Sequence, residues 1–229
     1  METNILVVNC GSSSLKLALF DSQYRKRASA LAERLNNEDA FARIGGDKNK
    51  ITLPANASHG ETLQILVSAF RERGLMSADP VAIGHRVVHG GETFYEAALI
   101  DERTLASIQA CASLAPLHNP VNLSGIEAGK SLFPDVPQVA VFDTAFHQTL
   151  PEKAYLYAVP EAWYSDWGIR RYGFHGTSHY FMAIEAARIL ERTPETTSII
   201  SAHLGNGCSI TAISDGQSVD TSMGFTPLE

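Results

Sequence analysis

The chain has 229 residues, of which 45% are hydrophobic and 19% are charged, and its formal net charge is −7 at pH 7. This composition is typical of a globular protein with one large domain or two small ones, and no apolar run approaches membrane-spanning length. The negative charge disfavours nucleic acid as a partner, because nucleic acid selects a basic face, whereas nucleotides need only a few local cations.

Cysteine usage indicates the compartment. Cys10, Cys111 and Cys208 are odd in number and far apart, so they form neither a disulfide framework nor a zinc-binding set. The first residues lead into an apolar run without the charged leader and apolar core of a signal peptide. We therefore expect a cytoplasmic protein in a reducing compartment, with no membrane partner.

Two apolar runs near the N-terminus, 5–8 and 17–20, are predicted to be short buried strands. The stretch N-C-G-S-S-S-L-K at 9–16 joins them with one glycine, three serines and a lysine. Hydroxyls, main-chain N–H groups and an ammonium group are donors that bind a phosphate chain. We interpret this stretch as a phosphate-binding hairpin, and the alternative is a solvated polar turn. Its spacing matches neither a P-loop nor a dinucleotide fingerprint.

The next segments are predicted in less detail up to residue 59, with a turn at 45–47 and a strand at 50–53. A helix is predicted for 61–73, because its apolar residues fall on one face and Gly74 occupies the position after the C-cap. A strand is then predicted from residue 80, ending in the H-R-V-V-H-G-G stretch at 85–91.

Two further helices and a strand follow. Asp101 is the predicted N-cap of a helix that runs to about residue 112. Asn119 is the predicted N-cap of another helix, with Pro120 at its first position and its end at about residue 132. The apolar run 139–142 predicts a buried strand that leaves Asp143 at its carboxyl end, where open α/β sheets bind ligands.

Pro151 marks a predicted boundary between a domain of residues 1–150 and a second domain of residues 151–229. The second part is predicted to hold a helix at about 180–192 and two strands, 198–202 and 208–213, around a turn at 203–207. This strand–turn–strand pattern is similar to the one at 5–20, which suggests a duplicated α/β fold that holds the phosphates of a nucleotide between its halves. The alternative is that the similarity carries no evidence of duplication, because any two hairpins look alike.

Four polar clusters at predicted turns are candidates for chemistry. Each has a structural alternative: Arg86 could form a surface ion pair, His118 could be a solvated residue at a helix cap, Asp143 could be a turn carboxylate, and His175 could lie incidentally at a helix start. Together they supply cations and donors for a travelling phosphoryl group and a carboxylate for Mg²⁺ or substrate. This set favours phosphoryl transfer, and no His/Cys spacing predicts a structural zinc site.

Seven motifs in order carry a resemblance to a known family: N-C-G-S-S-S-L-K at 9–16, G-H-R-V-V-H-G-G at 84–91, P-L-H-N-P at 116–120, F-D-T-A-F-H at 142–147, R-R-Y-G-F-H-G-T-S-H at 170–179, H-L-G-N-G at 203–207 and D-T-S-M-G-F-T-P-L-E at 220–229. The chain resembles the acetate/propionate kinase family of the actin/Hsp70/sugar-kinase superfamily. The resemblance implies an α/β, ribonuclease H-like (actin-like ATPase) duplicated fold, with a complete first domain and the beginning of the second.

The resemblance also implies an activity, in which ATP and acetate form ADP and acetyl phosphate with Mg²⁺, in a protein that is a homodimer at full length. It assigns catalysis to Arg86, Asp143 and His175, and magnesium to Asn9. It assigns the acetate site to Arg86 and His118, with the methyl pocket formed by Val88, Leu117, Phe174 and Pro227. It assigns the nucleotide phosphates to Ser12, Ser14, Lys16, His203, Leu204, Gly205, Asn206 and Gly207.

Two points qualify what the resemblance implies. Acetate is already ionised near neutral pH and needs no general base, so we expect Asp143 to orient Mg²⁺ or Arg86 rather than to move a proton. Family members are longer than this chain, so we expect a fragment without the adenosine pocket and without full activity alone. A propionate or butyrate kinase and a non-catalytic nucleotide-binding remnant remain alternatives.

Overall fold

A computed structural model describes residues 3–47 and 49–227 of the chain. The chain forms two compact units: unit 1 runs up to Val87 and includes Ala98–Val141, and unit 2 comprises Val88–Ala97 and the residues from Phe142 onward. The expected division at residue 150 differs from these units at 88–97 and 142–150, and as a domain assignment it stays a prediction. None of the helices in the described part of the chain is both long and apolar enough to cross a membrane.

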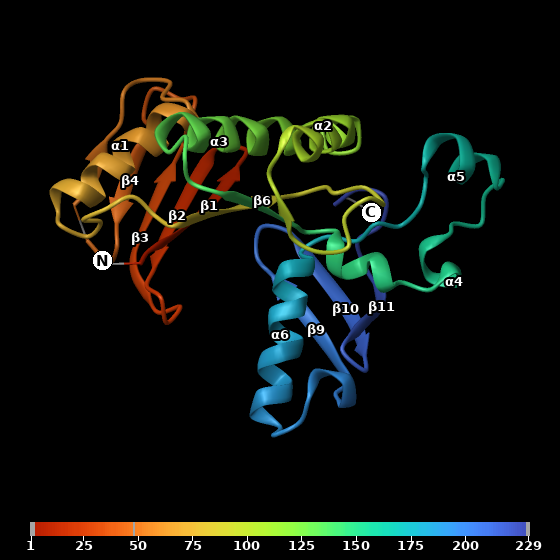
Figure 1. The fold of residues 1–229 in the computed structure, drawn as a ribbon. Helices are drawn as coiled ribbons and strands as arrows, with labels where there is room; N and C mark the ends of the chain where they lie inside the picture. The colour runs from red at the N-terminus through yellow and green to blue at the C-terminus, as the bar shows by residue number, and fades with distance from the viewer. Residues whose placement is uncertain (1–2, 48, 228–229) are drawn as a thin grey trace. The chain divides into compact units, whose positions relative to one another are not determined.

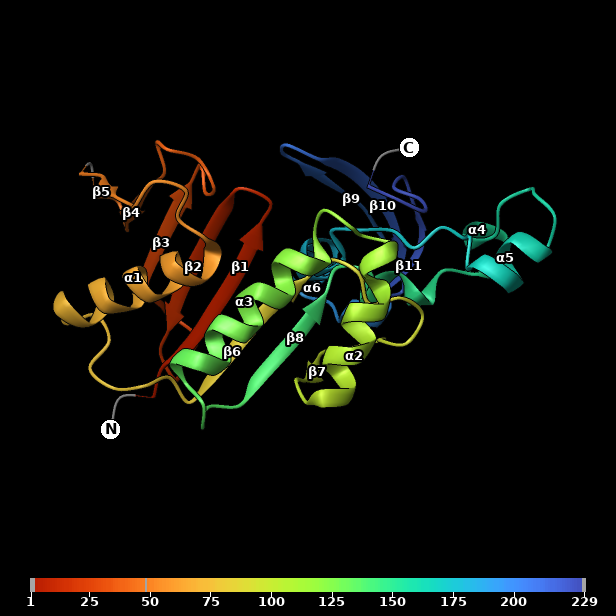
Figure 2. The ribbon, with the colours of Figure 1, turned by 90° about the horizontal axis from the view of Figure 1, so that it is seen from above.

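Unit 1 is built on an eight-stranded sheet with the order β5-β4-β3-β2-β1-β6-β8-β7 (Figure 2). Neighbouring strands from β5 to β1 pair antiparallel, whereas β1 pairs parallel with β6. The strands are β1 Ile5–Gly11, β2 Ser14–Phe20, β3 Lys26–Glu33, β4 Phe41–Ile44, β5 Ile51–Thr52, β6 Ala82–Val87, β7 Ala98–Leu99 and β8 Gln138–Phe142. The predicted strands at 5–8, 17–20 and 139–142 are thus confirmed.

Three helices lie over one face of this sheet: α1 His59–Glu72, α2 Glu102–Ala110 and α3 Asn119–Leu132, with a 3-10 turn at Cys111–Ser113 after α2 (Figure 1). A reciprocal pair of hydrogen bonds between Ser58 and Glu61 caps α1, and Gly74 beyond its end has φ +66°, as predicted. The apolar face of α1 packs on β2 and β3, so the core lies between helices and sheet.

The start of α3 differs from the sequence prediction by one residue. His118, not Asn119, occupies the N-cap position, and its side chain makes no capping bond. Asn119 is fully buried because its side-chain amide turns inward and donates to the carbonyl of Ile108 at 3.1 Å. A tertiary hydrogen bond therefore replaces the local cap that an Asn-Pro pair normally indicates.

Close packing joins α3 to the first strand. The Asn122 amide donates to the carbonyl of Cys10 at 2.9 Å, and a Cβ built on Gly125 would press into the Cys10 sulfur. Glycine at this helical position therefore lets α3 approach the strand that carries the serine hairpin.

We expect Gly125→Ala to lower the free energy of unfolding by about 1–3 kcal/mol, because the added methyl overpacks a buried contact. The Cys10→Ala/Gly125→Ala double variant should be more stable than the sum of the single effects predicts, since the remaining contact to the Cys10 Cβ is an ordinary 3.6 Å. Urea unfolding of all four proteins measures the coupling. Additive effects would show that the sulfur is not what the methyl meets.

Unit 2 contains a three-stranded antiparallel sheet of order β11-β10-β9 and three helices. Its elements are α4 Glu152–Tyr155, α5 Ala162–Trp167, α6 Gly176–Ile189, β9 Ile199–Leu204, β10 Cys208–Ser214 and β11 Gln217–Thr221, with 3-10 turns at Ala145–Thr149 and Pro194–Thr196. The predicted hairpin at 199–213 is confirmed, and α6 begins four residues earlier than predicted.

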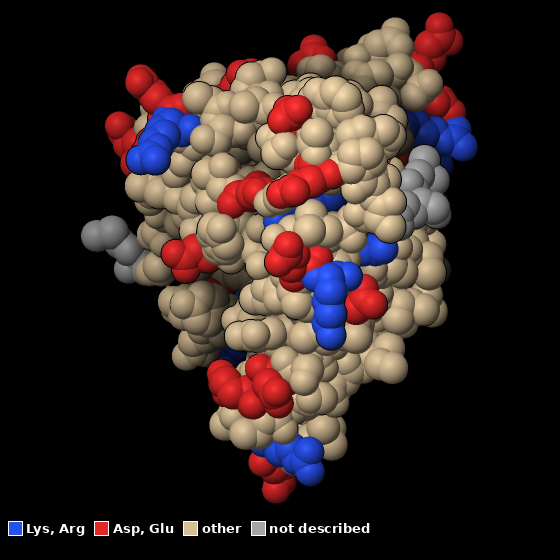
Figure 3. All heavy atoms as spheres, turned by 90° about the vertical axis from the view of Figure 1, so that its right-hand side faces the viewer, with Lys and Arg blue, Asp and Glu red and all other residues tan. Residues whose placement is uncertain are grey.

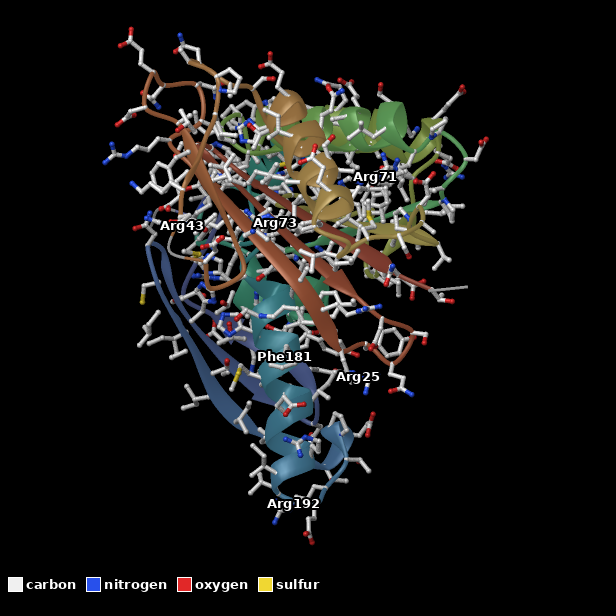
Figure 4. The ribbon with its side chains drawn as sticks, turned by 90° about the vertical axis from the view of Figure 1, so that its left-hand side faces the viewer. Arg25, Arg43, Arg71, Arg73, Phe181 and Arg192 are labelled. Atoms are coloured by element: carbon white, nitrogen blue, oxygen red, sulfur yellow. The ribbon has the colours of Figure 1, made fainter. Side chains whose placement is uncertain are left out.

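The sheet of unit 2 has an inner face that packs on α6 and an opposite face that is apolar and exposed. Ile200, Leu204 and Ile210 on that opposite face are 78%, 75% and 48% exposed. Phe181 on α6 also points outward (Figure 4). The inner face instead carries buried serines and threonines, so the usual polarity of a half-buried sheet is inverted here.

Two arginines, Arg170 and Arg171, anchor the segment that precedes α6 through an ion pair, a ring contact and hydrogen bonds. Arg170 pairs with Glu92 at 3.0 Å and lies over the Tyr155 ring at 3.9 Å. Arg171 donates to the carbonyls of Ala154 and Thr221, at 3.1 and 2.8 Å. Both arginines therefore have a structural role in unit 2, where they fix the backbone that leads to His175.

Candidate functional site

The serine hairpin is a tight β-turn between β1 and β2. The strands pair from Ile5 with Phe20 to Gly11 with Ser14, which leaves Ser12 and Ser13 exposed at the tip. His59 Nε2 is hydrogen-bonded to the carbonyl of Gly11 at 2.7 Å, so the first residue of α1 contacts the turn. The structure confirms the predicted hairpin and leaves its tip open to a ligand.

Asn9, Lys16 and Arg86 project from the face of the sheet that the helices do not cover. Asn9 lies directly opposite Lys16 in the β1–β2 pair, and Arg86 follows His85, the register partner of Val8. The Arg86 guanidinium donates to Asn9 Oδ1 at 3.3 Å. An amide, an ammonium and a guanidinium group therefore gather on three adjacent strands, a donor set that suits carboxylate and phosphate.

Unit 1 also holds His118 and Leu117, just before α3. Leu117 is 73% exposed and His118 is half-buried at the N-cap. The four residues assigned to the methyl pocket are divided between the units, because Val88, Phe174 and Pro227 belong to unit 2. Val88 and Phe174 are buried and Pro227 is half-buried, and the pocket stays a prediction.

In unit 2, a main-chain hydrogen bond joins Asp143 to Gly176, the residue that follows His175. Asp143 follows β8 and is 2% exposed, and its carbonyl accepts a 2.8 Å hydrogen bond from the N–H of Gly176. His175 is the N-cap of α6 with φ +58°, a left-handed conformation that is uncommon for a residue with a side chain. A Cβ on Gly176 would collide with the Asp143 carbonyl oxygen, so this approach requires glycine.

The loop at 203–207 lies against His175 within unit 2. The rings of His175 and His203 stack with centroids 4.1 Å apart and planes 26° from parallel. His203 Nδ1 is bonded to Ser178 Oγ at 2.9 Å, and a Cβ on Gly207 would lie 3.2 Å from His175 Cε1. Leu204, Gly205 and Asn206 form the exposed part of the loop.

Four buried histidines, one in unit 1 and three in unit 2, were not predicted as site residues. Burial lowers the pKa of each to about 4, from an ordinary value of 6.5, because desolvation disfavours the charged ring. The four are His85 in unit 1 and His89, His147 and His179 in unit 2. They are therefore neutral at physiological pH and act as fixed hydrogen-bonding groups.

We expect the free energy of unfolding to fall as pH decreases from about 6.5 toward about 4. The unfolded chain takes up protons at the ordinary histidine pKa while the folded protein resists them, so each such histidine contributes a slope of about 1.4 kcal/mol per pH unit. Above about pH 6.5 the contribution of these neutral histidines to the free energy of unfolding is fully present. Urea unfolding across this range checks the slope, and His85→Asn should reduce it by one histidine's share. A flat profile would contradict the buried neutral state.

Buried hydroxyl groups are the members of the site that sequence reasoning missed. Thr144 Oγ1 accepts from the N–H of Gly90 at 3.0 Å, and Ser209 and Ser201 are bonded to histidine rings. All three are at most 5% exposed. The available signal was the alternation of Ser and Thr with apolar residues along 208–213, which places the hydroxyls together on one face.

Comparison with known proteins identifies the chain's relatives. The model of the Acetokinase family matches residues 4–229. The chain belongs to the acetokinase family. An acetate kinase of Shewanella baltica (strain OS155) is 52% identical over 229 residues, which is 98% of this chain and 57% of the relative. The chain thus spans just over half the length of the curated relatives it matches.

Two solved structures at 40% identity or more have the same fold. A propionate kinase from Francisella tularensis superposes with a TM-score of 0.91 at 45% identity, and the Porphyromonas gingivalis acetate kinase with 0.92 at 40% identity. Each match covers 99% of this chain and 59% of the solved chain. The α/β, ribonuclease H-like class predicted for this chain is confirmed.

Proposed function

We propose that the protein carrying this chain is an acetate kinase that transfers the γ-phosphoryl group of ATP to acetate, reversibly, to give acetyl phosphate and ADP. The observation that carries the proposal is the 52% identity to an acetate kinase over 98% of the chain. An acetate oxygen attacks the γ-phosphorus, a new P–O bond forms, and the bond to the β-phosphate oxygen breaks.

The proposed roles follow the chemistry of each group. The planar fork of Arg86 suits the acetate carboxylate, with His118 in the same site, and Ser12, Ser14 and Lys16 suit the nucleotide phosphates. His175 stabilises the charge that spreads over the travelling phosphoryl group. The loop from His203 to Gly207 forms a second contact with the nucleotide phosphates.

A divalent metal is general to ATP-dependent phosphoryl transfer, and we propose Mg²⁺. No group of three or more His, Cys, Asp or Glu side chains among the described residues is arranged to hold a metal ion. Mg²⁺ usually takes one or two protein ligands and completes its shell with phosphate oxygens and water. Asn9 would hold such a nucleotide-bound ion through a water molecule, because its one side-chain oxygen already accepts a hydrogen bond from Arg86. When bound, the ion neutralises charge on the phosphates.

Asp143 is proposed as a positioning group, because acetate is already ionised and offers no proton to remove. The carboxylate is buried at the end of β8, next to the N-terminus of α6. From that position it orients the metal ion or Arg86 through its charge.

We expect Asp143→Asn to lower kcat by about 10² or more, in line with the loss of one preorganised electrostatic group. The shape of the pH–rate profile should stay that of the wild type. Steady-state assays of the intact protein across pH measure both quantities. Recovery of the variant's rate at high pH, in the manner of a replaced general base, would contradict the positioning role.

A propionate kinase is the second candidate, favoured by the solved propionate kinase that is 45% identical to this chain. The methyl pocket proposed from Val88, Leu117, Phe174 and Pro227 is small because Val88 is branched. One methylene is worth about 1–3 kcal/mol in such a pocket, so propionate should be a poorer substrate than acetate without being excluded.

Trapping of acyl phosphate with hydroxylamine tests the proposed function. The intact protein that contains this chain is incubated with ATP, Mg²⁺ and acetate, propionate or butyrate in turn. Acetate should give the highest kcat/KM. A preference for propionate or butyrate would support the second candidate, and binding of ATP without hydroxamate from any acid would indicate a non-catalytic nucleotide-binding protein.

We also propose a cytoplasmic homodimer that has no nucleic-acid or membrane partner. On the face drawn in Figure 3, Lys and Arg side chains are scattered among Asp and Glu side chains. The described residues of this face therefore show no continuous basic stripe of the kind that a polyanion requires.

A further inference from the structure

A continuous line of hydrogen bonds in unit 2 runs from β9 to the ring of His175. Ser201 Oγ is bonded to Nδ1 of His179 at 3.0 Å, and Nε2 of the same ring is bonded to Ser209 Oγ at 2.8 Å. Ser209 Oγ is in turn bonded to Nδ1 of His175 at 2.9 Å. The three groups behind His175 are at most 5% exposed, so water does not compete for these bonds.

The direction of the first bond follows from the hydroxyl of Ser201. A buried hydroxyl has one hydrogen, and leaving it without an acceptor is unfavourable. Among the described residues, His179 Nδ1 is the only side-chain partner of Ser201 Oγ. Ser201 therefore donates to Nδ1, and that nitrogen carries no proton.

The next two directions follow from the first. His179 is neutral because burial lowers its pKa to about 4, so its single ring proton lies on Nε2 and is donated to Ser209 Oγ. Ser209 then has its own hydrogen left, and its remaining ring partner is Nδ1 of His175. Each donor in the line therefore fixes the next one.

We infer that Ser201, His179 and Ser209 act as positioning residues that hold the neutral form of His175 in the tautomer protonated at Nε2. The partner of one ring nitrogen determines which nitrogen of a histidine carries the proton. With Nδ1 accepting from Ser209, His175 presents an N–H donor, and not a lone pair, from its other nitrogen. The use of that donor toward the γ-phosphoryl group rests on the proposed function, whereas the tautomer does not.

The ring of His203 stacks on that of His175 and so fixes its plane. His203 uses its own Nδ1 for Ser178. His147 provides an internal comparison: its Nε2 donates to the carbonyl of Phe174 at 3.0 Å, and its Nδ1 is bonded to Ser218 Oγ at 2.8 Å. A carbonyl oxygen can only accept, so the tautomer of His147 is set independently of its serine.

Long-range ¹H–¹⁵N NMR of the 229-residue chain, labelled on histidine and recorded at mildly alkaline pH without substrate, tests the inference. We expect His175 and His179 both to show a protonated Nε2 and an unprotonated Nδ1. A protonated Nδ1 on either ring would overturn the inference, even if no variant were made.

Three variants test the line itself. Ser209→Ala should shift the His175 Nδ1 resonance toward that of a protonated nitrogen. Ser201→Ala should shift the same resonance in the same direction, although Ser201 reaches His175 only through His179 and Ser209. Ser218→Ala, which removes an equivalent hydroxyl from His147, should leave His175 unchanged. A His175 spectrum unchanged in both Ser209→Ala and Ser201→Ala would overturn the relay. The expected tautomer in this chain, together with no acyl hydroxamate from the intact protein, would leave the relay standing and refute the proposed function.

Discussion

Replacing Gly176 with alanine is expected to lower the free energy of unfolding by about 3 kcal/mol, at the upper end of the range for overpacking. The new Cβ would collide with the carbonyl oxygen of Asp143 and lie 3.0 Å from the Cβ of Phe146. Backbone atoms cannot rotate away as a flexible side chain does. The start of α6 must therefore move from the end of β8, which breaks the 2.8 Å bond from Gly176 to Asp143.

The variant should also lose activity beyond its loss of stability, because His175 moves away from Asp143. Gly60→Ala is the matched control, since Gly60 also lies in the first turn of a helix and a Cβ there meets only the Ala128 methyl at 3.6 Å. Its stability should be unchanged or raised by up to about 1 kcal/mol. Urea unfolding separates the two. If Gly176→Ala were as stable as Gly60→Ala, the close approach of Gly176 to Asp143 would be wrong.

Replacing Arg86 with alanine is expected to lower kcat/KM of the intact protein for acetate by about 10³ or more, because the acetate carboxylate loses its planar partner and a positive charge next to the reacting groups is lost. The guanidinium lies on the open sheet face beside Asn9 and Lys16. Arg86→Lys should restore only part of the loss, because an ammonium keeps the charge but not the planar fork.

Arg25→Ala is the control for this experiment. Arg25 lies at the turn between β2 and β3, where it pairs with Asp21 and is largely exposed (Figure 4). Its loss should change kcat/KM by less than about twofold, since an exposed ion pair contributes little to stability. Equal losses in the Arg25 and Arg86 variants, or full recovery in Arg86→Lys, would contradict the role of the Arg86 fork.

Elements with a strong local pattern could be predicted from the sequence. The strands around the serine hairpin and α1 with Gly74 follow from apolar periodicity and a glycine stop signal. Asp143 was correctly predicted at the end of a buried strand. In each case the local sequence of the element is sufficient to predict it.

Elements whose pattern depends on distant partners could not be predicted. β3 begins with Lys26-Arg27 and buries alanines at alternate positions, which is a weak sequence signal for a strand. The segment forms a strand because it pairs with β2. The N-cap of α3 shifted to His118 because Asn119 found a buried acceptor in Ile108. Tertiary contacts outweighed local preference at both places.

The chemistry-bearing residues divide in the same way. Asn9, Arg86 and His175 could be singled out because glycines and turns surround them in the sequence. Ser201 and Ser209 could not, because their importance arises only when β9 and β10 place both hydroxyls on the ring of His179. The alternation along 208–213 indicates which face the hydroxyls share, but not which histidine ring they contact.

Phosphorus NMR of the intact protein with ATP, Mg²⁺ and acetate labelled with oxygen-18 tests the proposed phosphoryl transfer most directly. Direct attack of the carboxylate on the γ-phosphorus predicts acetyl phosphate that carries the heavy oxygen in its C–O–P bridge, formed together with ADP. Inorganic phosphate and ADP without labelled acetyl phosphate, or no consumption of ATP, would contradict it.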